Sequence, residues 1–189
     1  MFSQWTVLTL LGGTMTATAQ IPGYVAGTWD IDPAHSNVEF SVRHMGVAKS
    51  RGRFGSFRGE IVTAADPLES TVTATIEAAS IDTRQADRDA HLRSADFLDV
   101  EQFPTLTFRS TGVRQDGDDF VIDGEFTLRG VTKPVSLATE LGGFTENGLL
   151  GLSASVTINR TDFGVGPAGS AKVSEKVKIT LDIEAQRRD

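Results

Sequence analysis

His44 and Arg160 are polar residues at positions that the sequence pattern assigns to the interior. Each continues a run of alternate apolar residues, so each is predicted to point inward near the end of a strand. The preceding apolar residues are Val38, Phe40 and Val42 for His44, and Val156 and Ile158 for Arg160. A buried guanidinium needs a partner because an isolated charge is costly in an apolar interior. With His44, and with Arg88 or His91, Arg160 would hold a phosphate or another polar head group.

A structural role for Arg160 is the alternative. The acidic candidates for an ion pair are Asp162, which follows Arg160 closely, and Asp87 and Asp89 in a preceding polar segment. Such a pair would hold that segment in place without any ligand. The sequence leaves both roles open.

The chain offers little for metal or hydrolytic chemistry. His35, His44 and His91 match no standard zinc spacing, and the chain has no cysteine. His35 follows Asp32-Pro33 and is predicted to bond the turn that begins a long strand. No Gly-x-Ser-x-Gly nucleophile elbow accompanies the serines, histidines and aspartates. We therefore predict no metal, no cofactor and no catalytic residue.

Strands must position the candidate residues. Runs with period two and a single apolar face recur from Gly27 onward, at residues 38–44, 72–78, 106–108, 120–128, 135–141, 150–158 and 177–183. Asp-Gly and Asn-Gly turns at 116–118 and 146–148 predict antiparallel neighbours. Glycines at 52, 55 and 59 predict a sharply bent strand. Several runs reach about ten residues, which favours an all-β, eight-stranded barrel over a sandwich.

One segment departs from this period. Between Thr83 and Phe103, charged residues are interspersed with Ala86, Ala90, Leu92 and Ala95, as in a short helix. Asp82 or Thr83 is predicted to cap its start. Because it is the one long excursion between strands, we interpret it as a helical lid over one mouth of the barrel.

Length and charge define the frame. The 189 residues favour one domain at 27–186, after an N-terminal extension at 1–26 and before a tail at 187–189. A net charge of -7 argues against a nucleic-acid partner, and no window is long and apolar enough for a membrane-spanning helix. We expect a cytoplasmic protein. Export is the alternative if residues 1–19 are a signal peptide, although no Lys or Arg precedes Arg43.

Six motifs together resemble one known family. They are Asp32-Pro33-x-His35-Ser36, Phe40-x-Val42-x-His44, Gly52-x-Phe54-x-x-Phe57-x-Gly59, the run from Arg88 to Val100, Gly130-Val131-Thr132-Lys133-Pro134, and Asn159-Arg160-x-Asp162-Phe163-Gly164. In this order they are similar to the YceI family of lipocalin-like, polyisoprenoid-binding proteins. The resemblance implies an antiparallel barrel that holds a long-chain isoprenoid or similar amphiphilic lipid, often as a homodimer. No catalytic activity is established for the family as a whole.

The expected function is therefore non-catalytic binding, storage or transport of such a lipid. The predicted ligand-binding residues are Phe40, His44, Phe54, Ile76, Arg88, His91, Phe108, Phe126, Val156, Ile158, Arg160 and Phe163. One alternative is an enzyme that acts on a prenyl ligand through His44 or His91 with Arg160. Another is a packed barrel that acts through its surface in a stress response, because small barrels can also be filled by their own side chains.

Overall fold

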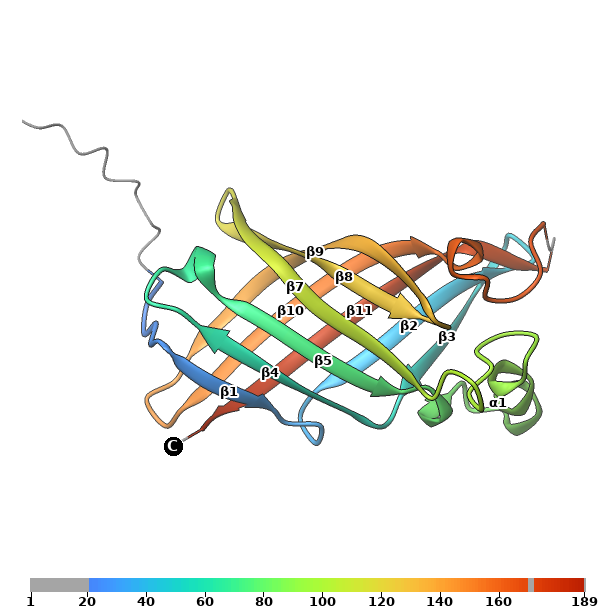
Figure 1. The fold of residues 1–189 in the computed structure, drawn as a ribbon, viewed down its shortest axis with the longest axis horizontal. Helices are drawn as coiled ribbons and strands as arrows, with labels where there is room; N and C mark the ends of the chain where they lie inside the picture. The colour runs from blue at the N-terminus through green and yellow to red at the C-terminus, as the bar shows by residue number, and fades with distance from the viewer. Residues whose placement is uncertain (1–20, 170–171, 189) are drawn as a thin grey trace, which may run out of the picture.

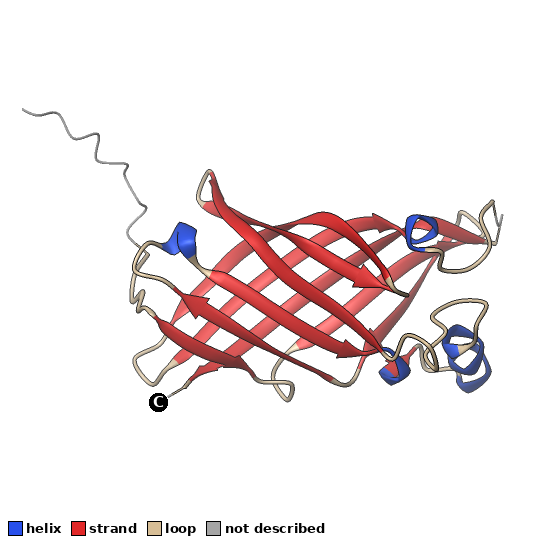
Figure 2. Cartoon of the chain, in the orientation of Figure 1, coloured by secondary structure: helices blue, strands red, loops and turns tan. Residues whose placement is uncertain are grey.

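The computed structural model describes residues 21–169 and 172–188, so the proposed signal peptide at 1–19 lies outside the described residues. The strands are β1 (Gly27–Ile31), β2 (Asn37–His44), β3 (Ala48–Phe54), β4 (Phe57–Thr63), β5 (Thr71–Glu77), β6 (Ile81–Asp82), β7 (Thr105–Asp116), β8 (Asp119–Leu128), β9 (Val131–Phe144), β10 (Leu149–Asn159) and β11 (Val173–Arg187). One α-helix, α1 (Ala86–Arg93), and three 3-10 helices, η1 (Pro67–Glu69), η2 (Ala78–Ser80) and η3 (Arg160–Phe163), complete the described elements (Figure 2).

The sheet closes into an eight-stranded antiparallel barrel, as predicted (Figure 1). Closure comes from β11, which pairs with β1 near its C-terminal end and with β2 along the rest of its length. In the same way, β4 pairs with β1 while β3 pairs with β2. Thus β1 and β2 share one place in the wall, and β3 and β4 share the next. The break at Gly55-Ser56 is the bend predicted from the glycines.

The two ends of the barrel differ. The end that carries α1, η3 and the β2–β3 hairpin is called the mouth, and the opposite end, with η1 and the β9–β10 turn, is called the base (Figure 1). Trp29 and Leu150 fill the base, each 1% exposed, and the indole Nε1 of Trp29 donates to Thr63 Oγ1 at 2.8 Å. The base is therefore plugged by close-packed side chains.

The wall is incomplete at the mouth. The β9–β10 ladder ends at the pair Ser155–Ala138, although β9 continues to pair with β8 as far as Val131. Within the described part of the chain, the last residues of β10 therefore have no partner on β9. The β8–β9 hairpin diverges from β10 here and opens the side of the barrel.

The helical segment lies at the mouth, as predicted, but its first turn differs. Gln85 caps α1 by accepting the amide of Arg88, whereas Asp82 accepts the amide of Arg84 at 2.8 Å. The prediction of Asp82 or Thr83 as the cap was therefore wrong. Leu98, which follows the helix, is buried with Phe126 and Phe163, and this contact fixes the segment on the barrel.

Arg187 and Arg188 are not a free tail, in contrast to the prediction, and Asp189 lies outside the described residues. Arg187 is the last residue of β11. The guanidinium of Arg188 pairs with the carboxylates of Asp30 and Glu60, so the end of β11 is fastened to β1 and β4. No helix within residues 21–169 and 172–188 is long and apolar enough to cross a membrane.

Candidate functional site

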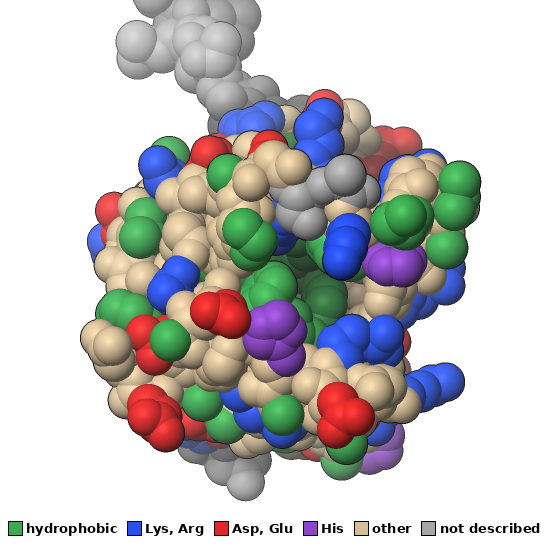
Figure 3. Space-filling model, turned by 90° about the vertical axis from the view of Figure 1, so that its right-hand side faces the viewer, with side chains coloured by type: hydrophobic (Ala, Val, Ile, Leu, Met, Phe, Trp, Pro, Cys, Tyr) green, Lys and Arg blue, Asp and Glu red, His purple; other side chains and the backbone are tan. Residues whose placement is uncertain are grey.

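The interior of the barrel contains an apolar cavity of about 110 Å³. Ten strands contribute residues to its wall, which is apolar except at Glu39 and Arg58. Six predicted ligand-binding residues line it: Phe40, Phe54, Ile76, Phe108, Phe126 and Val156. Viewed from the mouth, the molecule is hollowed, with hydrophobic side chains in the hollow and several Lys, Arg and His side chains, and an acidic one, near its edge (Figure 3).

The burial pattern identifies the interior as a hollow. Phe40, Phe54, Ile76, Phe108 and Val156 line the cavity, yet all are only half-buried. An inward side chain in a closed wall keeps accessible surface only where it faces unfilled space. A filled barrel, one alternative from the sequence, does not have this pattern.

Two glycines allow aromatic rings to lie against the wall. The ring of Phe40 is so close to Gly52 that a Cβ there would lie 2.4 Å from the ring, and Phe108 lies equally close to Gly124. Phe40 lies directly opposite Gly52 on the neighbouring strand, whereas Phe108 on β7 lies diagonally from Gly124 on β8, whose register partner is Ser110. Any larger residue at Gly52 or Gly124 would push the ring toward the centre, so these glycines help to keep the centre open.

An open groove adjoins the cavity where β9 and β10 separate. It has a volume of about 990 Å³ and shares Val135 and Val156 with the cavity wall. The predicted residues Ile158 and Phe163 line this groove rather than the cavity. Both are buried, and Phe163 packs edge-to-face on Phe126 with ring centroids 5.7 Å apart. Ile158 and Phe163 therefore form part of the rim of the hollow at the mouth.

Arg160 has a different environment from either of the two predicted ones. The strand ends at Asn159, whose side chain caps η3, so Arg160 lies in the 3-10 helix and is 4% exposed. Its guanidinium donates to four backbone carbonyl oxygens, those of Val165, Ser174, Pro167 and Val173, at 2.6, 3.1, 3.2 and 3.3 Å. The expected ion pair with Asp162, Asp87 or Asp89 is absent from the described residues. Arg160 thus holds the β10–β11 connection.

The other predicted polar residues do not converge on one point. His44 ends β2 and is exposed at the mouth. His91 is on α1, where Nε2 lies 3.0 Å from Asp96 Oδ2 and the ring packs on Phe97. Arg88 donates to the hydroxyl and carbonyl oxygens of Thr83, each at 2.7 Å. No shared head-group pocket is formed by these side chains.

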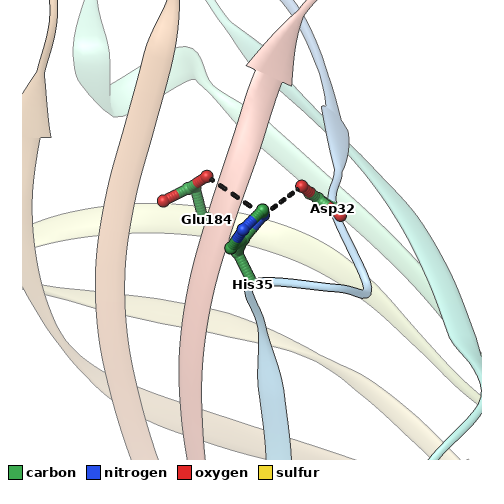
Figure 4. A group of neighbouring side chains, drawn as sticks. All are labelled: Asp32, His35 and Glu184. Carbon is green, nitrogen blue, oxygen red and sulfur yellow. Dashed lines mark hydrogen bonds and ion pairs between the residues drawn. The ribbon is translucent and has the colours of Figure 1, made fainter.

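His35 bonds the turn before β2, as the sequence predicts (Figure 4). Its Nδ1 lies 2.7 Å from Asp32 Oδ2 and 3.7 Å from Glu184 Oε1. The hydrogen bond with Asp32, together with the two negative charges, raises the pKa of His35. The same bond, with the amide of Ala34, lowers the pKa of Asp32. These three side chains could supply one metal-ligand atom each, but the turn-stabilising bonds account for their arrangement.

The sequence analysis missed part of the cavity wall and the hydrogen bonds by which Arg129 holds the helical segment. Cavity residues outside the predicted set include Ile31, Val38, Phe57, Ile61, Val72, Leu106, Ile122, Leu137, Leu152, Ile179, Leu181 and Ile183. Most of them share the alternating apolar parity that predicted the strands, so the signal was present. Arg129, in contrast, donates to Ala95 O at 2.7 Å and to Gly164 O, linking the helical segment to the β10–β11 connection. No local pattern indicates that role.

These features define a small antiparallel barrel that is plugged at the base, hollow and apolar within, and open at the mouth. Residues 29–185 match the family of the YceI-like domain, and the chain belongs to this family. A UPF0312 protein of Pectobacterium atrosepticum is 37% identical over 192 residues, covering 97% of each chain. Protein YceI of Escherichia coli is 38% identical over 171 residues, covering 85% of this chain and 87% of its own.

Solved structures share the fold. The Campylobacter jejuni YCEI protein has a TM-score of 0.70 at 26% identity, over 78% of this chain and 90% of its own. BcnA of Burkholderia cenocepacia has a TM-score of 0.77 at 20% identity, over 82% and 99%. A domain from Saccharophagus degradans, described as polyisoprenoid-binding and implicated in plant cell wall breakdown, has a TM-score of 0.69 at 14% identity, over 87% and 100%.

Proposed function

We propose that this protein is a non-catalytic lipid-binding barrel whose interior takes the hydrocarbon chain of an isoprenoid or a similar amphiphile. The observation that carries the proposal is the apolar hollow, lined by half-buried side chains and closed at the base. An apolar chain in such a hollow gains about 25 cal/mol for each Å² of surface removed from water. Binding would therefore need few polar contacts.

The size of the cavity limits how a ligand fits. Its volume of about 110 Å³ is below the roughly 300–1,000 Å³ typical of small-molecule sites. A long chain would therefore have to turn the rings of Phe40, Phe54 and Phe108 aside, or extend into the groove beside Val156. The half-buried state of these residues supports this, because partly unpacked rings can change rotamer at low cost.

The choice of an isoprenoid has separate support. The Saccharophagus degradans domain is described as polyisoprenoid-binding and shares the barrel at a TM-score of 0.69. A terminal head group would remain at the mouth, where several Lys and Arg side chains lie beside the opening (Figure 3). Carriage or storage of the lipid is the role that we propose.

Absence of catalysis is part of the same proposal. The enzyme alternative uses His44 or His91 as the acid–base group, but neither lines the cavity. His44 is exposed at a strand end, and His91 bonds Asp96. Arg160, offered as the anion stabiliser, is occupied by four carbonyl groups. Acid–base chemistry needs such groups within hydrogen-bond reach of the reacting atoms.

A titration with prenyl alcohols of increasing length tests the proposal. The delipidated protein would be titrated in competition with a fluorescent prenyl alcohol, and affinity should rise with chain length until the hollow is full. Val156→Trp fills the hollow from the inner face and should reduce affinity at least about tenfold, because each buried CH₂ that is excluded contributes about 0.8 kcal/mol. Glu140→Trp is the control, since Glu140 is an exposed residue of β9 that lines neither the cavity nor the groove.

Two results would contradict the proposal. One is an affinity that does not depend on chain length. The other is equal loss of binding in Val156→Trp and Glu140→Trp, since only Val156 lines the cavity and the groove.

A further inference from the structure

Two apolar side chains protrude from the tip of the β2–β3 hairpin at the mouth. Val47 is 86% exposed and Met45 is 57% exposed, and no other large apolar side chain of the described residues exceeds 39%. Hairpin tips normally carry Gly, Asn, Asp or Ser. Here only Gly46 meets that expectation, so the tip exposes apolar surface that the fold itself does not use.

The strands behind this tip carry an uncompensated positive charge. Arg43 on β2 lies directly opposite Lys49 on β3, and Arg51 is the next outward residue of β3. Like charges at directly opposed positions destabilise a sheet. Within the described parts of the chain, Arg43, Lys49 and Arg51 make neither an ion pair nor a side-chain hydrogen bond. The repulsion between them is therefore not relieved inside the protein.

A polar groove extends this charge along β3. Its volume is about 410 Å³, and its wall includes Lys49, Arg51, Arg84 and Arg88. The wall has two acidic residues, Glu39 and Asp82, and Asp82 pairs with Arg53 at 3.2 Å. Five basic residues against two acidic ones leave the groove with an excess of positive charge. The chain as a whole carries a net charge of -7. The cationic surface is thus local to the hairpin and to the adjoining segment.

We infer that the β2–β3 hairpin docks the mouth of the barrel onto an anionic lipid bilayer. Met45 and Val47 would enter the boundary between head groups and acyl chains, while Arg43, Lys49 and Arg51 contact lipid phosphates. An apolar tip beside a cationic surface is the pattern by which proteins bind anionic membranes. A nucleic acid would use the cations but leave the apolar tip without a role.

Docking in this orientation would connect the bilayer to the interior. Inward from the tip, Val42 pairs with Val177 and Phe40 pairs with Ile179, and all four are half-buried. Phe40 and Ile179 line the cavity. This apolar path gives a lipid a route out of the membrane. The route depends on the proposed function, whereas docking depends only on the hairpin.

Vesicle co-sedimentation of the full chain tests the inference. Wild type should bind phosphatidylcholine vesicles that contain phosphatidylglycerol and should bind phosphatidylcholine alone much less. Binding should weaken as salt rises, because salt screens exposed charges. No sedimentation with anionic vesicles at low salt would overturn the inference.

Three variants separate the tip from the charges. Met45→Ser/Val47→Ser should reduce partitioning about tenfold or more. Arg43→Gln/Lys49→Gln/Arg51→Gln should reduce it about fivefold for each charge removed and flatten the salt dependence. Val25→Ser/Leu68→Ser is the matched control, because both residues are 39% exposed and lie far from the hairpin: Leu68 is in η1 at the base, and the Val25 carbonyl accepts the hydroxyl of Thr63. An equal loss in this control would contradict docking by the hairpin.

A single label reports the depth of the tip. The chain has no cysteine, so Val47→Cys provides one attachment site for an environment-sensitive fluorophore. Its emission should shift to the blue on addition of anionic vesicles, whereas the same label at Leu68→Cys should not respond. Similar responses from both labels would overturn the inference.

Other occupants are distinguishable by the same variants. Tip-dependent dimerisation, measured by light scattering at the concentrations of the vesicle assay, would assign the hairpin to a second copy instead. Binding to duplex DNA that survives Met45→Ser/Val47→Ser, with vesicle binding absent, would assign the cations to nucleic acid. Prenyl-alcohol titration of the tip variant should remain as in wild type, so failure of docking and failure of the proposed function are read separately.

Discussion

Arg160 carries a buried charge that is compensated by carbonyl dipoles rather than by a carboxylate. Its four bonds join η3 to the start of β11 and to the connection between them. The sequence-based prediction missed this environment because strand parity was extended beyond Asn159, where an Asx cap begins η3. The Asn159-Arg160-Thr161 sequence contains that signal, since Asn often ends a strand by capping the next turn.

Arg160→Met should destabilise the protein by about 3 kcal/mol, because it leaves buried carbonyl groups without donors. Guanidinium chloride denaturation measures the change in the free energy of unfolding. Arg109→Met is a suitable control, since its ion pair with Glu125 is exposed and should contribute at most about 1 kcal/mol. If Arg160→Met kept its stability but bound a prenyl phosphate more weakly, Arg160 would bind the ligand head group instead of holding the β10–β11 connection.

His35 should titrate with a pKa above its usual value of 6.5, because Asp32 and Glu184 favour its protonated form. The stability that this interaction contributes is complete below the unfolded-state pKa of His35 and is lost as pH rises through the raised folded-state pKa. On the acid side, the lowered pKa of Asp32 makes its contribution disappear as pH falls through that lowered value. NMR titration of the His35 ring protons measures this pKa. In Asp32→Asn the pKa of His35 should be raised less than in wild type, and an unchanged pKa would contradict this account.

At the scale of the elements, period two predicted the long strands and their inward face, but not the short strands β1 and β6. The alternation that contains Phe40, Phe108 and Val156 also contains most of the cavity wall. Position along the strand was less predictable. His44 has the inward parity but lies at the end of β2, where solvent replaces the interior. Contacts between distant segments, such as Arg129 with Ala95 and Gly164, leave no periodic signal at all.

Gly124→Ala should destabilise the barrel by about 1–3 kcal/mol, since the new methyl group overlaps the ring of Phe108. It should also weaken binding of prenyl alcohols, because the displaced ring moves into the hollow. Gly112→Ala on β7 is the control: nothing lies within 4 Å of its Cβ position, and its effect should be within about 1 kcal/mol. Denaturation and prenyl titration of both variants provide the comparison. Equal effects would show that Gly124 has no packing role.

For the whole molecule, the two ends have different tasks. The base is held by Trp29, by Leu150 and by the ion pairs of Arg188, so it provides stability. The mouth combines an incomplete wall, a helical segment and a protruding hairpin, so it can admit a ligand. Sequence patterns predicted the closed barrel, but the location of the charges and of the opening depends on how distant segments meet. The predicted homodimer and the cellular compartment stay predictions.

A bound lipid should stabilise the whole barrel by mass action. At a free ligand concentration of one hundred times Kd, the expected gain is about 2.7 kcal/mol. For a domain of this length the gain corresponds to a rise in Tm of about 5–10 °C. Differential scanning calorimetry of delipidated and reloaded protein measures it, with Val156→Trp as the variant in which the gain at the same ligand concentration should fall to about 1.4 kcal/mol or less. A similar rise in that variant would place the ligand outside the hollow.

Native mass spectrometry of the full chain tests the central claim most directly. Protein reloaded with a long prenyl alcohol and sprayed under gentle conditions should show one ligand bound per chain, and this species should be depleted in Val156→Trp but retained in Glu140→Trp. Spectra that contain only the unliganded chain, or an adduct of equal abundance in both variants, would contradict a lipid-binding interior.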